Sequence, residues 1–167
     1  IDVELYHFPL GVSSWQGGDD HLGPLPSEGL RGSTIAKSVR RNSGIKIYKD
    51  GIRIMPYGDS YDDWLGLEKA AGKRGKGAIR NTALLGFVLL SSEKNPNIIE
   101  TTTRQKLISN EAFISLAGDP TVPVDKTNLP IMIRLIGKLQ KNWERIREKK
   151  DKVVRDQSGI AQNRLKQ

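Results

Sequence analysis

The side chains best suited to chemistry follow one another between residues 98 and 113. They are Thr101, Thr102, Thr103, Arg104, Gln105 and Lys106. Hydroxyl groups and cations both bind phosphate oxygens, and an arginine presents a planar fork of donors to them. The stretch therefore has two interpretations, a contact for phosphate groups or a solvated loop without chemistry of its own.

The flanking residues indicate what positions this loop. Residues 82–91 form a nearly continuous apolar run, typical of a central strand that is covered on both faces. Gly86, within that run, indicates a bulge or a close packing partner. After the loop, residues 109–111 can cap a helix that ends at Gly118. We therefore expect the loop to lie between a buried strand and a capped helix.

A second cationic stretch, residues 72–77, reads Gly-Lys-Arg-Gly-Lys-Gly and contains Lys73, Arg74 and Lys76. It matches neither the glycine fingerprint of dinucleotide sites nor a P-loop. A flexible basic loop is the simpler interpretation. A contact with a polyanion such as nucleic acid is the alternative.

The remaining candidate ligands do not predict a metal site. Asp62 and Asp63 are adjacent carboxylates, which are more typical of caps and turns than of a metal or general-base pair. His21 follows two aspartates but has no fourth ligand nearby. The absence of cysteine excludes disulfides and thiolate sites and makes a reducing cytoplasm the default expectation.

Length and composition predict one domain with a helical appendage. The chain has 167 residues, of which 37% are apolar and 28% charged, and no apolar run approaches the roughly 18 residues that cross a membrane. The net charge is +8, and residues 138–167 carry ten Lys or Arg against four Asp or Glu, a net +6. This basic segment is the second feature that suggests a nucleic-acid partner.

The first half of the chain reads as a strand, a loop, a helix and a hairpin. Residues 2–8 alternate as a strand does, residues 11–32 are typical of a long mobile loop, and residues 33–41 suit a short helix. Asp50-Gly51 between two alternating runs predicts a hairpin over residues 45–58. We expect its isoleucines to cover the core and three other side chains to share the opposite face. The former are Ile45, Ile47, Ile52 and Ile54, and the latter are Lys46, Tyr48 and Arg53.

We expect the domain to span residues 1–127 and a long amphipathic helix to span residues 128–156, with Pro130 in its first turn. Its apolar stripe comprises Met132, Ile136, Leu139, Trp143 and Ile146. The stripe favours a packing helix over a nucleic-acid-binding one. Residues 157–167 are expected to be a disordered tail.

Three segments resemble motifs of the second domain of GHKL ATPases, the superfamily of gyrase B, Hsp-type chaperones, histidine kinases and MutL. The similarity is greatest to bacterial ATP-binding proteins of the Hsp-like class, and it covers about residues 1–117. Gly44–Gly58 resembles Gly-Ile-x-Ile-Tyr-Arg-Asp-Gly-Phe-Arg-Val-x-Pro-Tyr-Gly, and Asp63–Leu67 reads Asp-Trp-Leu-Gly-Leu. Glu100–Phe113 resembles Asp-Gln-Thr-Asn-Arg-Glu-Gly-Leu-Ile-x-Asn-Glu-Ala-Phe.

The resemblance implies a transducer, or middle, domain with the α/β sandwich of the ribosomal protein S5 domain 2-like fold. In these ATPases the domain supplies a cation that contacts the γ-phosphate when it closes on the nucleotide-binding domain. The matching position is Arg104, with Lys106 as a reserve cation and Thr101, Thr103 and Gln105 as supporting residues. Thr101 and Gln105 depart from the asparagine and glutamate of the chaperone loop.

The resemblance also implies partners and a cofactor. A parent protein would bind ATP and Mg²⁺ through an N-terminal GHKL nucleotide-binding domain, and it would act as a homodimer. The Glu-x-x-x-Asn and Asp-x-Gly-x-Gly motifs of that domain do not occur in residues 1–167. We therefore expect this chain, which begins at Ile1, to be a piece of a longer protein and inactive by itself.

Overall fold

The computed structural model describes residues 1–8, 32–59, 61–74, 78–103, 105–119, 121–122, 127 and 129–164. The long loop expected over residues 11–32 lies outside this range, except for Gly32, which begins a helix. His21 and its two neighbouring aspartates lie outside the described residues as well.

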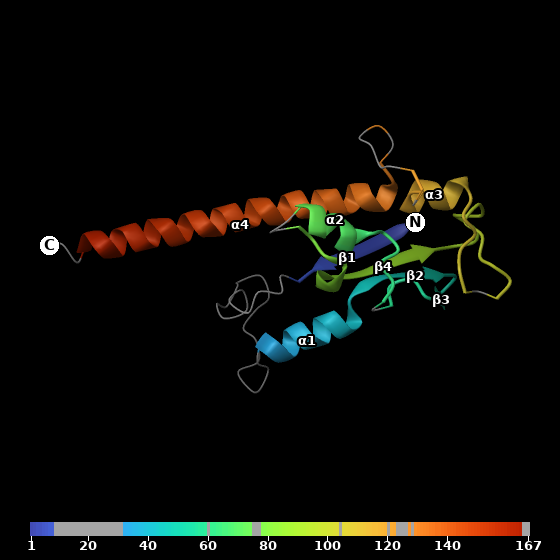
Figure 1. Ribbon diagram of the computed structural model, residues 1–167, viewed down its shortest axis with the longest axis horizontal. Helices are drawn as coiled ribbons and strands as arrows, with labels where there is room; N and C mark the ends of the chain where they lie inside the picture. Colours follow the sequence, from blue (N-terminus) through green and yellow to red (C-terminus); the bar gives the residue numbers. More distant parts are fainter. Residues whose placement is uncertain are drawn as a thin grey trace.

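The described residues form a mixed α/β fold around a four-stranded sheet of order β1-β4-β2-β3 (Figure 1). The central strands β4 and β2 are parallel, and each pairs with an antiparallel edge strand. The strands are β1 (Asp2–His7), β2 (Gly44–Lys49), β3 (Ile52–Ile54) and β4 (Leu84–Leu90). The helices are α1 (Gly32–Asn42), α2 (Leu67–Arg74), the short 3₁₀ helix η2 (Asn81–Ala83), α3 (Glu111–Ala117) and α4 (Ile131–Arg164).

The predicted hairpin is present between β2 and β3. Its turn residues Asp50 and Gly51 both have positive φ, 49° and 81°, as the two central residues of a type I′ turn require. Ile45 and Ile47 are fully buried, as is Ile54 across the ladder. Ile52, in contrast, is 48% exposed, so the expectation that it covers the core is wrong. It lies beside the turn on β3, a three-residue strand at the edge of the sheet that the described residues form.

Strand β4 occupies the centre of the sheet, as expected, but only one of its faces is fully buried. Leu84, Gly86 and Val88 are buried, whereas Leu89 is exposed on the opposite face, so the expectation that both faces are covered is wrong. The pairing of β4 continues without a bulge past Gly86. A Cβ at this glycine would lie 2.8 Å from Leu5 Cδ2 and 2.9 Å from Ile45 Cγ1. Gly86 therefore serves close packing between the three strands.

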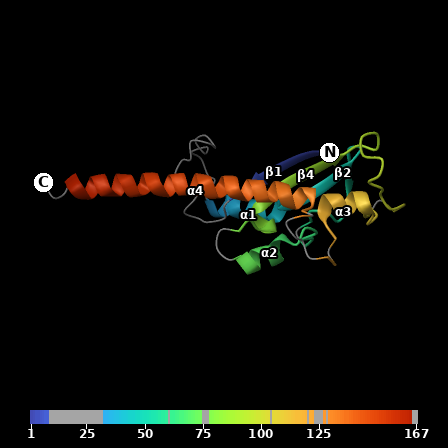
Figure 2. The same cartoon turned by 90° about the horizontal axis from the view of Figure 1, so that it is seen from above.

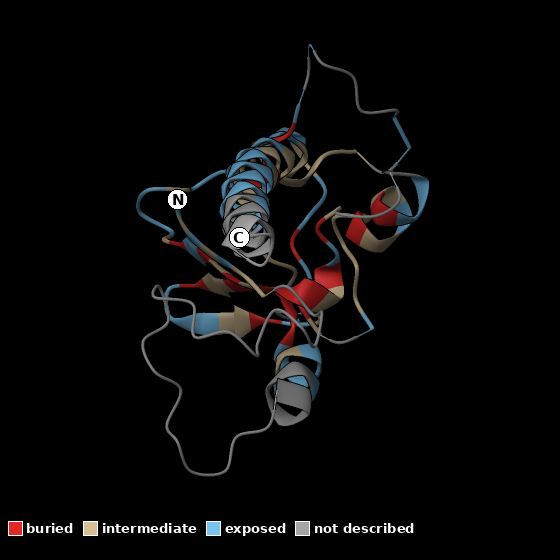
Figure 3. Cartoon of the chain, turned by 90° about the vertical axis from the view of Figure 1, so that its left-hand side faces the viewer, coloured by how far each residue is buried: buried red, intermediate tan, exposed pale blue. Residues whose placement is uncertain are grey.

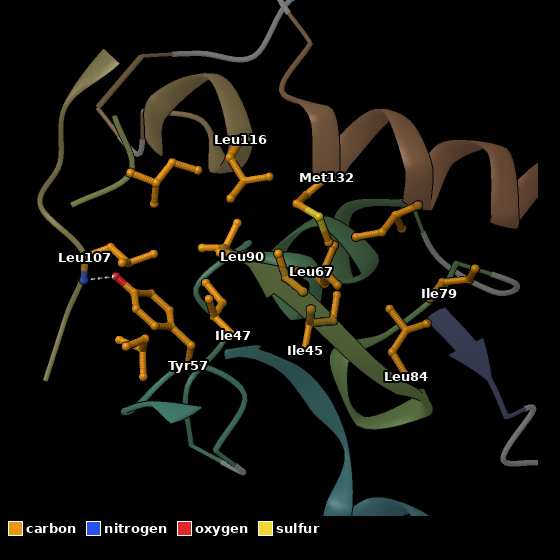
Figure 4. Packing of buried hydrophobic residues seen from close by; sticks show 14 residues of the cluster. Ile45, Ile47, Tyr57, Leu67, Ile79, Leu84, Leu90, Leu107, Leu116 and Met132 are labelled. Atoms are coloured by element: carbon orange, nitrogen blue, oxygen red, sulfur yellow. Dashed lines mark hydrogen bonds between the residues drawn. The ribbon is translucent and has the colours of Figure 1, made fainter. Parts of the chain in front are cut away.

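The core lies between the buried face of the sheet and three helices (Figures 3 and 4). Leu67 of α2, Leu116 of α3 and Met132 of α4 point toward Ile45 and Ile47 of β2 (Figure 4). Burying a side chain of this size contributes roughly 1.5–3 kcal/mol. This packing fixes β2 and β4, from whose ends the candidate site is built.

The described side chains of helix α4 that are buried against the domain lie in its first half. Met132 and Ile136 are buried, but Ile146 is 49% exposed, and the C-terminal half extends beyond the strands and the other helices in both views (Figures 1 and 2). The helix also continues to Arg164, so the expected end at residue 156 and the disordered tail 157–167 are incorrect over residues 157–164. A single interior glycine, Gly159, costs only about 1 kcal/mol and does not end a helix of good helix formers.

None of the helices in the described ranges combines the length and hydropathy that crossing a membrane requires.

Candidate functional site

The polar loop 101–106 is closed at its base by a short two-stranded ladder. The ladder consists of the bridge Glu100–Leu107 and two hydrogen bonds, from Thr101 N–H to Lys106 O at 2.8 Å and from Ile108 N–H to Ile99 O at 2.7 Å. The loop therefore begins and ends at one fixed place, and its tip projects from that base.

Two buried side chains attach this base to the domain. Lys49, at the end of β2 and only 9% exposed, donates from Nζ to the carbonyl oxygen of Ile98 at 2.7 Å. On the other side, Leu107 N–H donates to the hydroxyl of Tyr57 at 3.2 Å (Figure 4). Since buried polar groups without partners are costly, both bonds restrict where the base of the loop can lie.

Tyr57 is itself held by an aromatic cluster. Its ring lies 5.3 Å from the ring of Trp64 and 5.8 Å from that of Phe113, and the last two stack at 6.2 Å. Trp64 Nε1–H also donates to the carbonyl oxygen of Ile45 at 2.9 Å. Burial raises the pKa of Tyr57 above its ordinary value of 10.0, so its hydroxyl is protonated at neutral pH as in any tyrosine. Each of the three sequence segments that resemble the GHKL transducer contributes one ring to this cluster.

At the tip, Thr102, Thr103, Gln105 and Lys106 are exposed. Thr101 is half-buried, and its hydroxyl lies 3.3 Å from that of Thr103 and accepts a 3.3 Å hydrogen bond from Lys106 N–H. The structure thus brings Thr101, Thr103 and Lys106 together. Arg104, the principal candidate, lies outside the described residues.

The charge of Lys106 acts on a half-buried carboxyl group, that of Asp62. Burial raises the pKa of Asp62, and Asp59 and Asp63 raise it further, while the Gly58 N–H and the charge of Lys106 oppose the increase. Asp62 accepts the Gly58 N–H at 3.3 Å.

Asp63 is a helix cap, as the sequence predicts. Its carboxylate accepts the Leu67 N–H at 2.8 Å and the Glu68 N–H at 2.9 Å at the start of α2. Asn110 has the same role in α3, where it accepts the Phe113 N–H at 3.0 Å. Both caps satisfy amide groups that a helix N-terminus leaves without partners.

The second cationic stretch, residues 72–77, is helical over residues 72–74, where we expected a loop, and residues 75–77 lie outside the described residues. Gly72, Lys73 and Arg74 belong to α2, because the cap at Asp63 starts a helix whose Ala71 is buried. Lys73 is exposed on that helix, while the side chains of Arg74 and Lys76 lie outside the described residues.

Sequence reasoning missed both residues that anchor the loop. The sequence contained a signal for Lys49, because this residue continues the inward-facing alternation of Ile45 and Ile47. A lysine at a buried position needs a hydrogen-bond partner. Tyr57 had no comparable signal, because its contact with Leu107 joins positions fifty residues apart.

Within the described part of the chain, no three His, Asp or Glu side chains are grouped to hold a metal ion. Comparison of the chain with protein-family models, curated proteins and solved structures finds no match.

Proposed function

We propose that this chain is the transducer domain of a GHKL-type ATPase, with the ribosomal protein S5 domain 2-like fold. In this proposal, loop 101–106 contacts the γ-phosphate of ATP through Arg104. The observation that supports it best is the anchoring of the loop. Lys49 and Tyr57 hold its base, while Thr102, Thr103 and Lys106 are exposed at its tip.

A fixed base with a cationic tip suits a group that meets its ligand only when two domains close. Arginine stays charged and offers several donors to phosphate oxygens, so its binding energy would favour the closed, ATP-bound state. ATP and Mg²⁺ would be held by an N-terminal nucleotide-binding domain of the same protein, which we propose to act as a homodimer. The nucleotide state would thereby control the conformation of the dimer.

The test is Arg104→Ala in the protein that contains both domains. We expect ATP turnover to fall by about tenfold or more, since comparable arginines contribute about 10³–10⁵ in GTPases. Nucleotide affinity, measured by titration, should change little, because the adenine and Mg²⁺ contacts lie in the other domain. Arg134→Ala, at an exposed position of α4, is the matched control. Unaltered turnover in Arg104→Ala would refute the assignment.

A nucleic-acid-binding module is the second candidate, and the extended half of α4 favours it. Five exposed cations lie between residues 145 and 155, from the middle of α4 into its extended half: Arg145, Arg147, Lys149, Lys152 and Arg155. Affinity of the 167-residue chain for duplex DNA and for RNA, measured from about 50 to 200 mM salt, separates the two functions. Tight binding with a steep salt dependence supports this candidate, and its absence rejects it.

A further inference from the structure

A hollow of about 370 Å³ opens where the C-terminal end of α1 meets the sheet. Three cationic side chains line it, from Arg41 of α1, Lys46 of β2 and Arg53 of β3. One carboxylate, Asp59, also lines it and forms an ion pair with Arg53. Three positive charges and one negative charge leave the lining with a net charge of +2.

We propose that this hollow binds the phosphate group of a small phosphorylated molecule. A phosphate monoester carries a charge of about −1.5 to −2 at neutral pH, which matches the excess of the lining, whereas a carboxylate would neutralise only half of it. The volume is within the range of about 300–1,000 Å³ that small-molecule sites occupy, so it has room for more than the phosphate alone. The proposal does not depend on the transducer assignment.

Lys46 is the side chain best placed to bind the anion. It is half-buried, and its Nζ donates to the carbonyl oxygen of Asn42 at 2.7 Å, which uses one of its three donors. Burial lowers the pKa of Lys46 and the positive charge of Arg53 lowers it further, while the charge of Asp59 opposes the decrease. A bound anion would offset both the burial and the repulsion.

Three carbonyl groups near the end of α1 already have side-chain partners. The carbonyl oxygen of Ser38 accepts from Asn42 Nδ2 at 2.9 Å, and that of Arg40 accepts from Ser43 Oγ at 2.9 Å. The carbonyl oxygen of Asn42 accepts from Lys46. Of the three cations that line the hollow, Lys46 alone caps a carbonyl group of α1, so Arg41 and Arg53 are not explained by helix capping.

The wall of the hollow is held rigidly at Gly58. This residue has a φ of +74°, and a Cβ on it would lie 2.6 Å from the carbonyl oxygen of Ile45. Only glycine allows the segment to lie directly against β2. This contact keeps Asp59 beside Arg53 and leaves Lys46 outside that ion pair.

Titration of the 167-residue chain with inorganic phosphate and with glycerol phosphate at constant ionic strength tests the proposal. Amide chemical shifts report the location, and acetate serves as the anion control. We expect saturable shifts in residues 41–46 and 53–59 with both phosphates and none with acetate. Tighter binding of glycerol phosphate would show that the hollow also contacts the carrier, while equal binding would restrict the site to the phosphate group.

Arg41→Gln and Lys46→Gln should each weaken phosphate binding about fivefold, as expected for one partly exposed charge contact. Lys94→Gln, at an exposed turn after β4, is the matched control and should leave affinity unchanged. Arg41 is exposed on the helix, so its variant tests the site even if Lys46→Gln disturbs the end of α1. Shifts that do not saturate, shifts centred elsewhere, or equal weakening by the control would overturn the proposal.

Discussion

Removal of a single oxygen atom tests whether Tyr57 holds the candidate loop. Tyr57 is 8% exposed, and its hydroxyl is the acceptor for Leu107 N–H, which is buried as well. Tyr57→Phe keeps the ring contacts with Trp64 and Phe113 but leaves that N–H without its partner. The perturbation is therefore confined to the attachment of the loop.

The expected loss of stability follows from the burial of both groups. A buried donor left without an acceptor costs about 1–3 kcal/mol, more than the net value of an ordinary hydrogen bond. For a chain of this length, each kcal/mol lowers Tm by about 2–4 °C. Tyr57→Phe should therefore unfold roughly 2–12 °C below the unsubstituted protein.

The assay combines urea unfolding with amide hydrogen exchange. The free energy of unfolding should fall at an unchanged m value, and the amide of Leu107 should exchange faster. The control is Tyr61→Phe, at a side chain that is 78% exposed and bonds to Asp59 at 3.1 Å. We expect this variant to stay within about 0.5 kcal/mol of the unsubstituted protein.

Two results would contradict this reasoning. If Tyr57→Phe costs no more than Tyr61→Phe, the hydroxyl does not hold the loop. If stability falls but the exchange of Leu107 does not accelerate, the loss comes from the aromatic cluster instead.

Two further predictions concern pH. His7 packs edge-on against Trp143 at 5.0 Å, and burial lowers its pKa below 6.5, so the stability it contributes should be present at neutral pH and lost as the pH falls through the folded pKa. In urea unfolding from pH 7.5 to 5, His7→Phe should lose less stability than the unsubstituted protein; equal losses would contradict this. Burial raises the pKa of Asp62, so its charged form destabilises the fold at neutral pH. Asp62→Asn should be more stable at pH 7, and the gain should vanish below the unfolded value of 3.8; a gain independent of pH would point to a packing effect.

Local chemistry made much of the fold predictable. The turn residues Asp50 and Gly51 specify the hairpin because few residues adopt positive φ, and the cap at Asn110 marks the start of α3. The failures arose where tertiary position overrides local pattern. Ile52 has the alternation of a core residue but lies at an edge, and the apolar run of β4 does not reveal that one face stays open.

The candidate site was predictable only in part, because the sequence shows residue types but not the contacts between residues that are far apart along the chain. Residue types and the resemblance indicated loop 101–106 and its cations, but not what supports them. Lys49 and Tyr57 act through contacts across about fifty residues, and such contacts follow from the packed fold rather than from spacing. The hollow beside Lys46 likewise assembles from α1, β2 and β3.

The aromatic cluster offers a structural explanation for the resemblance to GHKL transducers, apart from any ATPase function. The three segments of the resemblance meet through the packed rings of Tyr57, Trp64 and Phe113, and the Tyr57 hydroxyl accepts from Leu107 N–H at the base of the loop. Their agreement with the family pattern therefore concerns the support of the loop, and a domain without ATPase function could share it. Anchoring of the loop gives no reason for an arginine at position 104, which is the part of the family motif that would contact phosphate. Arg104→Ala therefore tests the function, while Tyr57→Phe tests the support. Loss of turnover in the first, with the exchange of Leu107 unchanged, would assign the chemistry to the arginine itself.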